Sequence, residues 1–442
     1  MSAFRVSICV HSGGGIGGLS LALVIGKYGQ IPVDIFEAGP EITTVGAGIS
    51  CFGRTMDIMK ELGLYDELID LAIHPPQDET GPNFRKSDQH DGYYWFQRKL
   101  KRGPLSLHRK DLIDLLFRHL PASCNVQTSK RLTSYTTNGQ TQSITLRFSD
   151  GTIAQTDVLI GADGIHSVTR KTMYQALASD CQESEVEKKL LDCIEPVWTG
   201  TLLYRNLVPM EKLLQKFPDV QAPTELTLHL GKGKHIVSYP ISQGRLLNVL
   251  VINQDYDSFG TPFEGRWVVD VPAKEILDQY EDWEPRARAL VKCFENPSRW
   301  ALHTLRPLPF YTHDRVALIG DAAHATEPHF GAGAGQAIED AFILGRLLTH
   351  ELTHRDNVAQ AMKTYEEVRL PFANGIVERS EHIGRLYCFY GVSDDRFVSP
   401  RETEVLNHVK RSIEDAWEWQ NGSDWAWDKA ERLWRTNAAS IN

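Results

Sequence analysis

The chain has 442 residues, enough for two or more domains, with 42% hydrophobic and 24% charged residues, as in ordinary soluble globular proteins. A formal net charge of −10, with no basic run of five or six residues, argues against a nucleic-acid binder. No apolar stretch reaches the length of a membrane span, and the N-terminus lacks a signal-peptide core with a cleavage site. The seven scattered cysteines show no metal-ligand spacing, which predicts free thiols in the cytoplasm.

A glycine-rich turn follows the first predicted strand, residues 5–10, and precedes a helical pattern at 19–28. It contains the pattern G-x-G-x-x-G, formed by Gly13, Gly15 and Gly18. A second predicted strand, 33–36, ends at Glu37, nineteen residues after Gly18. At that spacing an acid binds the ribose hydroxyls of a dinucleotide whose pyrophosphate lies at the helix N-terminus. The first segment therefore predicts a dinucleotide site.

Two further short motifs lie in the N-terminal third. Residues 45–49 (VGAGI) form a loop of exposed backbone, or alternatively a simple turn before a helix at 54–62. Residues 108–112 (HRKDL) read as the start of a helix with Asp111 near its positive end. Farther on, 130–153 is predicted to be β-structure with hairpin turns, and 157–170 is a strand followed by a basic segment.

The middle of the chain alternates as antiparallel strands do, after an acidic stretch at 179–192 that we expect to be a surface connection. The predicted strands are 202–207, 226–230, 234–239 and 246–252. Helical patterns at 273–279 and 285–293 follow them. We expect this part to form a substrate domain.

The most informative stretch is 315–341, RVALIGDAAHATEPHFGAGAGQAIEDA. A buried strand, 316–319, is followed by Asp321, then by glycines alternating with alanines, then by a helix at 336–348. In open α/β sheets, ligands bind where the strands end, and glycine allows the backbone to approach them closely. The pattern predicts a ligand site that includes Asp321 and a helix N-terminus.

These motifs resemble those of the FAD-dependent aromatic-ring monooxygenases, especially the fungal salicylate-hydroxylase-like branch. The resemblance implies an α/β fold: a Rossmann-like FAD-binding domain, an inserted, mainly antiparallel β substrate domain and a C-terminal helical segment. The expected divisions are 1–178 (FAD domain with some substrate strands), 193–300 (substrate sheet), 301–375 (second part of the FAD domain) and 376–442 (helical tail). His11-Ser12 departs from the family, whose first strand runs directly into glycine.

The resemblance also carries roles onto individual residues. FAD contacts are expected at Gly13, Gly15, Gly18, Glu37, Ala47, Gly48, Arg109, Asp163, Asp321, Gly331, Gly333 and Ala334. Asp321 would bind the ribityl chain, and Asp163 belongs to a motif that serves FAD and the passing NAD(P)H. Arg170 is either a phosphate contact or a salt bridge on a solvated helix.

Arg205 and Tyr239 match positions that bind the substrate phenolate in the phenol-dearomatising members of the family. Their alternative is a cross-strand pair on the outer face of the sheet. We expect no metal site at His324 and His329; a structural hydrogen bond is expected for His324, whereas His329 could face the substrate. The five tryptophans of the tail are expected to dock it onto the body, with a role in binding as the alternative.

The implied reaction uses FAD, NAD(P)H and O2 to hydroxylate a phenol or salicylate-type ring through a C4a-hydroperoxyflavin. Loss of the carboxylate or oxidative dearomatisation of a phenolic polyketide would use the same chemistry. A flavin oxidase or dehydrogenase without NAD(P)H is a second class, and a flavin-binding protein without turnover, suggested by His11-Ser12, is a third. The expected partners are a small aromatic substrate and O2, with no nucleic acid; the sequence leaves the substrate, the nicotinamide and the oligomeric state open.

Overall fold

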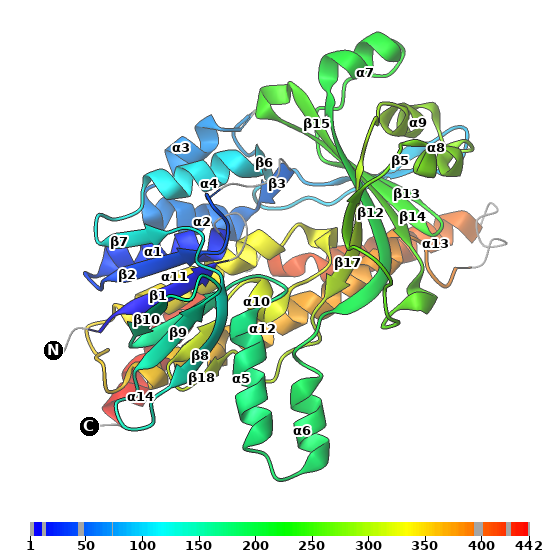
Figure 1. Ribbon diagram of the computed structural model, residues 1–442. Coiled ribbons are helices and arrows are strands. Elements are labelled where there is room, and N and C mark those ends of the chain that lie inside the picture. The colour runs from blue at the N-terminus through cyan, green and yellow to red at the C-terminus, as the bar shows by residue number, and fades with distance from the viewer. Residues whose placement is uncertain are drawn as a thin grey trace.

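The computed structural model describes residues 4–10, 15–42, 48–72, 74–392, 401–420 and 426–440. Two large sheets, with helices around them, give the α/β architecture that the sequence predicts (Figure 1). The smaller sheet lies with the N-terminal helices, and the larger sheet lies to the other side of the molecule. Within the described ranges, no helix is both long and apolar enough to cross a membrane.

The six-stranded sheet has the order β18-β19-β11-β1-β2-β7 and is parallel except for β18. Its strands are β1 (Val6–Val10), β2 (Val33–Glu37), β7 (Cys124–Gln127), β11 (Val158–Ala162), β18 (Thr312–His313) and β19 (Val316–Leu318). Every residue of β1 and β2 is buried, because both faces of this sheet are covered. The helices α1 (Ile16–Tyr28) and α11 (Gly333–Leu348) pack together beside it.

The other face of this sheet packs against a three-stranded antiparallel sheet. Its strands are β8 (Leu132–Thr137), β9 (Ile144–Phe148) and β10 (Ile153–Thr156), joined at the two predicted hairpin turns. The ring of Phe36 of β2 packs against that of Phe148 of β9 at an angle of 43°, with ring centroids 4.7 Å apart. A small two-stranded sheet, β3 (Gly48–Cys51) with β6 (Leu105–His108), leads to the larger sheet.

The eight-stranded sheet has the order β16-β17-β12-β15-β14-β13-β4-β5 and is antiparallel except for the β13–β4 pair. Its strands are β4 (Asn83–Lys86), β5 (Tyr93–Gln97), β12 (Val197–Pro209), β13 (Thr227–Gly231), β14 (Lys234–Ile241), β15 (Leu246–Gln254), β16 (Val268–Asp270) and β17 (Ser298–Thr304). One face packs against the three helices α7 (Met210–Lys216), α8 (Lys274–Leu277) and α9 (Pro285–Lys292). Strand β17 spans the division expected at residue 300.

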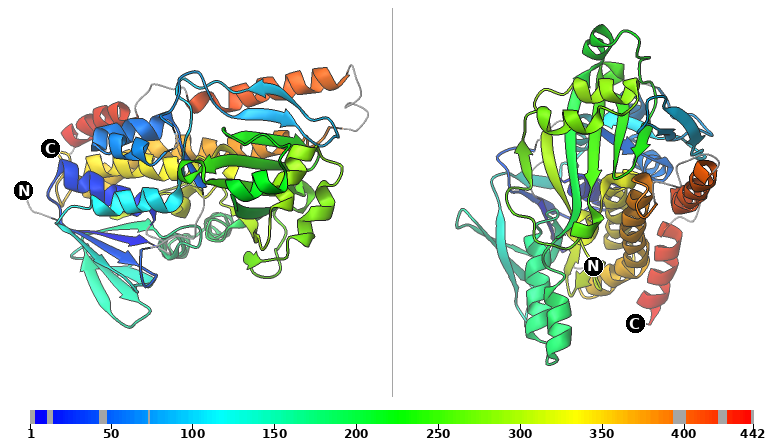
Figure 2. Two further views of the ribbon diagram at one scale, coloured as in Figure 1. Left: turned by 90° about the horizontal axis from the view of Figure 1, so that it is seen from above. Right: turned by 90° about the vertical axis from the view of Figure 1, so that its right-hand side faces the viewer.

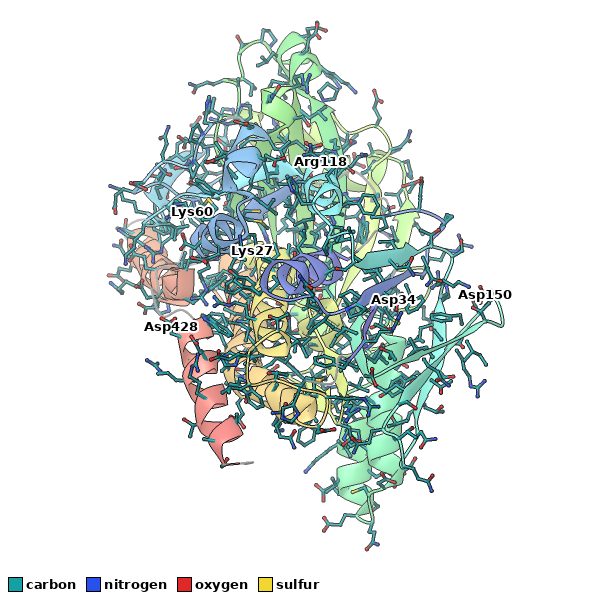
Figure 3. All side chains as sticks on the ribbon, turned by 90° about the vertical axis from the view of Figure 1, so that its left-hand side faces the viewer. Lys27, Asp34, Lys60, Arg118, Asp150 and Asp428 are labelled. Atoms are coloured by element: carbon teal, nitrogen blue, oxygen red, sulfur yellow. The ribbon has the colours of Figure 1, made fainter. Side chains whose placement is uncertain are left out.

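The remaining N-terminal helices surround the sheets. They are α2 (Gly53–Leu62), α3 (Tyr65–Asp70), α4 (Arg109–Arg118), α5 (Val168–Ser179) and α6 (Ser184–Leu191). Lys27, Lys60 and Arg118 project from α1, α2 and α4 into solvent (Figure 3). Part of the expected surface connection at 179–192 is the helix α6, none of whose residues is buried; a polar composition identified the surface location but not the helix.

Three helices follow α11: α12 (Val358–Tyr387), α13 (Arg401–Ala416) and α14 (Ala426–Ala439). Helix α12 runs the length of the molecule, while α13 lies beside β4 and β5 and α14 lies near the N-terminal domain (Figure 2). Trp427 and Trp434 of α14 are buried in the core of the six-stranded sheet and its helices, so this part of the tail docks as predicted.

Candidate active site

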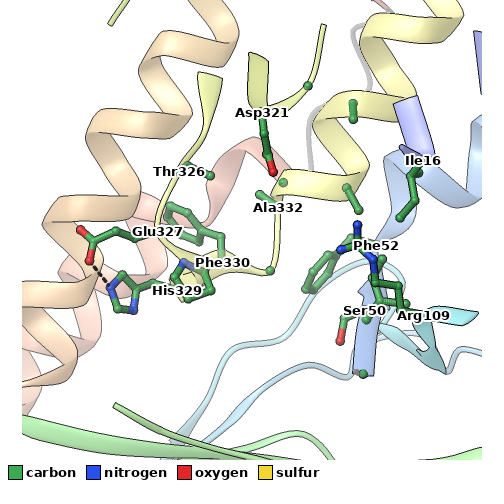
Figure 4. A pocket seen from close by; sticks show the side chains of 18 of the residues that line it. Ile16, Ser50, Phe52, Arg109, Asp321, Thr326, Glu327, His329, Phe330 and Ala332 are labelled. Carbon is green, nitrogen blue, oxygen red and sulfur yellow. Dashed lines mark hydrogen bonds and ion pairs between the residues drawn. The ribbon is translucent and has the colours of Figure 1, made fainter. Parts of the chain in front are cut away.

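A cavity of about 360 Å³ lies between the two large sheets. One wall, part of which Figure 4 shows with Ile16, Asp321 and Ala332, comes from the glycine-rich segments of the parallel-sheet domain. The other wall comes from β13, β14 and β15 of the larger sheet. Eight of the residues predicted for the site line it: Gly15, Gly48, Arg109, Tyr239, Asp321, Gly331, Gly333 and Ala334. The fold therefore brings together motifs that are as much as 319 positions apart, from Gly15 to Ala334.

The turn that carries Asp321 is held by buried charges. Gly320 has φ +60°, which side chains other than hydrogen disfavour, and its N–H donates to the Asp340 carboxylate at 2.9 Å. Arg369 Nε also donates to Asp340, at 2.8 Å, and both side chains are fully buried. Burial would raise the pKa of Asp340, but His324 and Arg369 outweigh it and hold the pKa at about 2. The anchored turn leaves the exposed Asp321 at the cavity.

Bare backbone and helix N-termini also face the cavity. No described side chain caps the first turn of α1 or of α11, so their free N–H groups remain available. Gly331 has φ +63°, and Gly15 and Gly17 also line the cavity. Exposed N–H groups at helix N-termini and glycine backbone suit the phosphates and polar ring edge of a dinucleotide.

Four predicted contacts are not on the cavity wall. At Gly18 of α1, a Cβ would meet Val10 Cγ1 at 2.5 Å. The glycine therefore allows α1 to pack closely on β1. Glu37 is buried at the end of β2, and its Oε1 accepts the Gly39 N–H at 2.5 Å. Asp163 and Arg205 are the third and fourth predicted residues that do not line the cavity. Gly13 and Ala47, like His11-Ser12, lie outside the described residues.

Asp163 and Arg170 both serve the structure around α5. Asp163 accepts hydrogen bonds from the backbone N–H of Thr169 at 2.9 Å and from Ser167, which holds the first turn of the helix. Arg170 is 1% exposed and donates to the carbonyls of Ala322 and Ile194, each at 2.9 Å. The expectation of a salt bridge on a solvated helix is therefore wrong. The guanidinium is buried, and it donates hydrogen bonds to backbone carbonyls that come together only in the folded chain. Its phosphate role has no support, since these carbonyls occupy it.

Arg205 and Tyr239 lie on the same face of the larger sheet. Arg205 pairs with Leu250, which pairs with Val237, and Tyr239 is two residues farther along the same strand as Val237. Residues two apart in a strand share a face. Val237 and Leu250 line the cavity, so Arg205 and Tyr239 are on the cavity face, and the expected alternative of the outer face is wrong. Arg205 stacks on Trp300, with its Cζ 4.9 Å from the ring centroid.

Electrostatics link these two residues to Arg109. Burial, and then repulsion by Arg109, lower the pKa of Arg205, while Tyr239 acts in the opposite direction. Burial also lowers the pKa of Arg109, against the attraction of Asp321, and the Arg109 Nε has no partner among the described residues. Burial raises the pKa of Tyr239, so its phenol is neutral at pH 7. Arg109 and the neutral Tyr239 on the cavity wall, together with the Arg205 guanidinium on the same face of the sheet, make this end of the cavity favour anions.

Several cavity residues were missed by the sequence patterns. Trp417, after α13, lines the cavity and donates its indole N–H to Tyr387 at 3.0 Å, so part of the tail contributes to the cavity and not only to docking. Glu327 was also missed; it is buried and lines the cavity next to Phe330 and to His329, which the sequence had offered as a substrate contact (Figure 4). His324 makes the expected structural hydrogen bond, to Asp340 at 2.5 Å. Glu327 directly precedes Pro328-His329 in the stretch 315–341, and an acid beside that glycine motif was the signal in the sequence that could have identified it.

Comparisons with known proteins agree with this arrangement. The family model described as FAD binding domain matches residues 6–198 and 278–380. The salicylate hydroxylase of Pseudomonas putida is 35% identical over 391 residues, covering 87% of this chain and 86% of that protein. The FAD-dependent monooxygenase str9 of Strobilurus tenacellus is 34% identical over 439 residues, covering 92% and 94%. The solved structure of a salicylate hydroxylase substrate complex superposes with a TM-score of 0.80 at 29% identity, covering 98% of each chain.

The fold and the cavity are therefore those of a flavin-dependent monooxygenase. The chain belongs to the FAD binding domain family and is an FAD-dependent monooxygenase of the salicylate hydroxylase type. The residues present fit FAD: the uncapped helix N-termini, the glycine backbone and the unpaired Arg109 Nε suit its phosphates and polar ring atoms. Among the described residues, no group of three or more His, Cys, Asp or Glu side chains could hold a metal ion.

Proposed function

We propose that this monooxygenase uses NAD(P)H and O2 to hydroxylate an electron-rich phenol or salicylate-type ring. The observation that carries the proposal is the placement of Arg205 and Tyr239 on the cavity face of the sheet, near Arg109. The salicylate hydroxylase relatives support the reaction type. We also propose that the protein acts in the cytoplasm, which is a reducing compartment. The support is that all seven cysteines are free.

FAD would be held along the glycine-lined wall. Gly15, Gly331, Gly333 and Ala334 would lie beside it with Gly48, Asp321 would accept hydrogen bonds from its ribityl hydroxyls, and Arg109 would donate to it. Gly13, Glu37, Ala47 and Asp163 are proposed for the same cofactor, with Gly18 and Asp163 acting through the positions of α1 and α5. When bound, FAD supplies the redox chemistry, accepting electrons from NAD(P)H and activating O2.

The protein's own task is to hold the ring and increase its electron density. A free phenol has a pKa of about 10, and a nearby cation lowers such a value by roughly 1–3 units. Arg205 would stabilise the substrate phenolate, and the neutral Tyr239 would donate a hydrogen bond to it. The apolar side chains of Leu228, Val237 and Leu250 would exclude water from the ring.

Oxidative dearomatisation is a second candidate. The same pair, Arg205 and Tyr239, favours it, because a phenolate is equally the species that accepts oxygen at a substituted ring carbon. We also propose that residues 1–178 and 301–375 form the FAD domain, 193–300 the substrate sheet and 376–442 the helical tail. The family match on both sides of 199–277 supports an inserted substrate domain.

The test is mass spectrometry of products from FAD-loaded protein supplied with NADPH or NADH, O2 and a panel of salicylates and acylphenols. Gain of one oxygen supports hydroxylation, and gain of oxygen with loss of CO2 supports a salicylate reaction. Gain of oxygen with loss of aromatic absorbance supports dearomatisation. Reduction of the flavin by substrate alone, without NAD(P)H, would instead support an oxidase or dehydrogenase.

A further inference from the structure

A second cavity, of about 300 Å³, adjoins the first one, and Leu226 lines both. Leu226 directly precedes β13, whose first residue, Thr227, pairs with Ser238 of β14. One step past that pair, Leu226 stands opposite Tyr239, and the Cβ atoms of such cross-strand neighbours are roughly 5 Å apart. Leu226 therefore lies beside the end of the first cavity that is proposed to hold the phenolate.

The partition between the two cavities is a single row of residues. Three neighbouring segments each place one residue on the first cavity and the adjoining residue on the second: Tyr239 and Pro240, Leu226 and Glu225, Pro82 and Gly81. The segments lie side by side, because the N–H of Asn83 donates to the Leu226 carbonyl at 2.9 Å. Successive residues of an extended segment are only about 3.3 Å apart, so the second cavity begins where the first one ends.

The small sheet of β3 and β6 contributes the rest of the partition. Ser50 of β3 lines the first cavity together with Arg109 (Figure 4), and Ser106 of β6 lines the second. The two serine Oγ atoms are 3.4 Å apart. Among the described residues, only Leu226 lines both cavities, and its side chain is partly exposed. Leu226 therefore controls the junction between them.

The second cavity combines rigid apolar rings with neutral polar groups. Its apolar part includes four prolines, Pro75, Pro76, Pro104 and Pro240. Proline has a fixed φ and no N–H that needs a partner, so these rings form a preorganised apolar surface. The described lining contains no Lys or Arg, and its carboxylate, Glu225, accepts a hydrogen bond from Asn83. This lining suits a neutral group, whereas a carboxylate would find no such cation and would approach Glu225.

We propose that the second cavity holds a neutral alkyl or acyl chain carried by the phenol ring, and that Leu226 is the specificity-determining residue at its entrance. This inference rests on the proposed function, which places the phenolate at Arg205 and Tyr239, and it adds the substituent of the ring. The ring and a chain of about three carbon atoms, with bonds of about 1.5 Å, reach from Tyr239 past Leu226. A leucine side chain changes rotamer without breaking a hydrogen bond, so the chain can pass it.

The test measures, by isothermal titration calorimetry, how phenol, the propylphenols and the hydroxyphenylpropanoates bind to the FAD-loaded protein. The ortho, meta and para isomers of both chains are included, because the pose of the ring decides which position faces Leu226. At least one propylphenol should bind at least roughly tenfold more tightly than phenol, since each buried methylene group contributes about fourfold. The propanoate at the same ring position should show no such gain, because its carboxylate would lie near Glu225.

Two variants determine where the chain lies. Leu226→Trp fills the junction, and Thr224→Trp fills the second cavity from its exposed rim. In each variant the affinities for propylphenol and phenol should come to within about threefold of one another. Gln221→Trp is the matched control, because Gln221 is exposed on the same segment and lines neither described cavity wall, and its preference should equal that of the wild type. The FAD content of each variant establishes that it is folded, and Thr224→Trp decides the question if Leu226→Trp loses FAD.

Three results would each overturn the inference: no propylphenol that binds roughly tenfold more tightly than phenol, an equal gain for the propanoate, or a preference that survives in Thr224→Trp. The proposed function is tested separately on the same samples, by NAD(P)H oxidation and product mass. If phenols are hydroxylated without any preference for the chain, the function stands and the inference fails. If NAD(P)H never reduces the flavin, the function fails, while the ratio of the binding constants still shows whether the second cavity holds the chain.

Discussion

His324 Nε2 lies 2.5 Å from Asp340 Oδ2, and both side chains are buried behind the turn that carries Asp321. The same carboxylate accepts the Gly320 N–H and the Arg369 guanidinium. Arg369 also donates to Glu339 at 2.8 Å, and Glu339 pairs with Arg54 of α2. The turn beside the cavity is thus fixed by α11, α12 and α2 together, through charges that are buried except for the partly exposed Arg54.

Replacing Asp340 by alanine should therefore be severe. The change leaves Arg369 with one buried acid partner fewer and Gly320 N–H without an acceptor, and breaking a buried ion pair costs about 3–5 kcal/mol. Urea unfolding of the FAD-loaded protein measures the loss. Asp428→Ala, an exposed change on α14 (Figure 3), should stay within about 0.5 kcal/mol of the wild type. A loss below about 1 kcal/mol in Asp340→Ala would contradict this account.

The same carboxylate predicts how stability depends on pH. Its folded pKa, about 2, lies below the unfolded value of about 3.9. The stabilisation from Asp340 is therefore complete above pH 4 and is lost as the pH falls through 4 toward 2. Free energies of unfolding measured between pH 5 and about 2 should fall more steeply in the wild type than in Asp340→Asn, which cannot titrate there. Parallel curves would show that Asp340 is not a source of the acid sensitivity.

Much of the fold was predictable because its signals are local. The alternation in β1, β14 and β15, and the apolar run of β19, each reflect burial of a strand, which requires no knowledge of its partner. The glycine motifs could be recognised in the sequence, because a close approach of the backbone to its neighbours or a positive φ strongly favours glycine. The polar, acidic composition of 179–192 did not reveal α6, because the helix has only eight residues, too short a stretch for its apolar spacing to be distinguished from that of a loop.

The site was less predictable because its remaining contacts are long-range. Trp417 reaches the cavity only because α13 lies beside β4 and β5, which the tail sequence does not specify. The burial of Arg170 depends on carbonyls at Ile194 and Ala322, far along the chain. The burial of Glu327 beside His329, and the lack of a partner for its Oε1 among the described residues, likewise depend on the folded neighbourhood.

Asp321→Ala should reduce the FAD content of the purified protein. The side chain is exposed at the cavity, so the fold should survive while the proposed ribityl contact is lost. Losing a hydrogen bond to a charged group costs roughly 1.5–3 kcal/mol, or about one to two orders of magnitude in affinity. Absorbance of the flavin relative to protein measures the content. Asp66→Ala, an exposed change on α3, is the control, and an Asp321→Ala protein that retains all its flavin would argue against the assignment.

Arg205→Ala should remove oxygen transfer while FAD remains bound. Arg205 is on the cavity face, whereas Arg299 of the neighbouring strand pairs with Glu275 on the opposite face and provides the matched control. Loss of the cation raises the substrate's phenol pKa toward about 10, so product formation at pH 7 should fall on the order of 100-fold, and Arg299→Ala should change it little. Because the phenol ionises in solution as the pH rises, the deficit should shrink between pH 7 and about 9. Product mass and NAD(P)H consumption, measured together, show whether reduction continues without hydroxylation. A variant with normal turnover, or a deficit independent of pH, would assign the phenolate to another group.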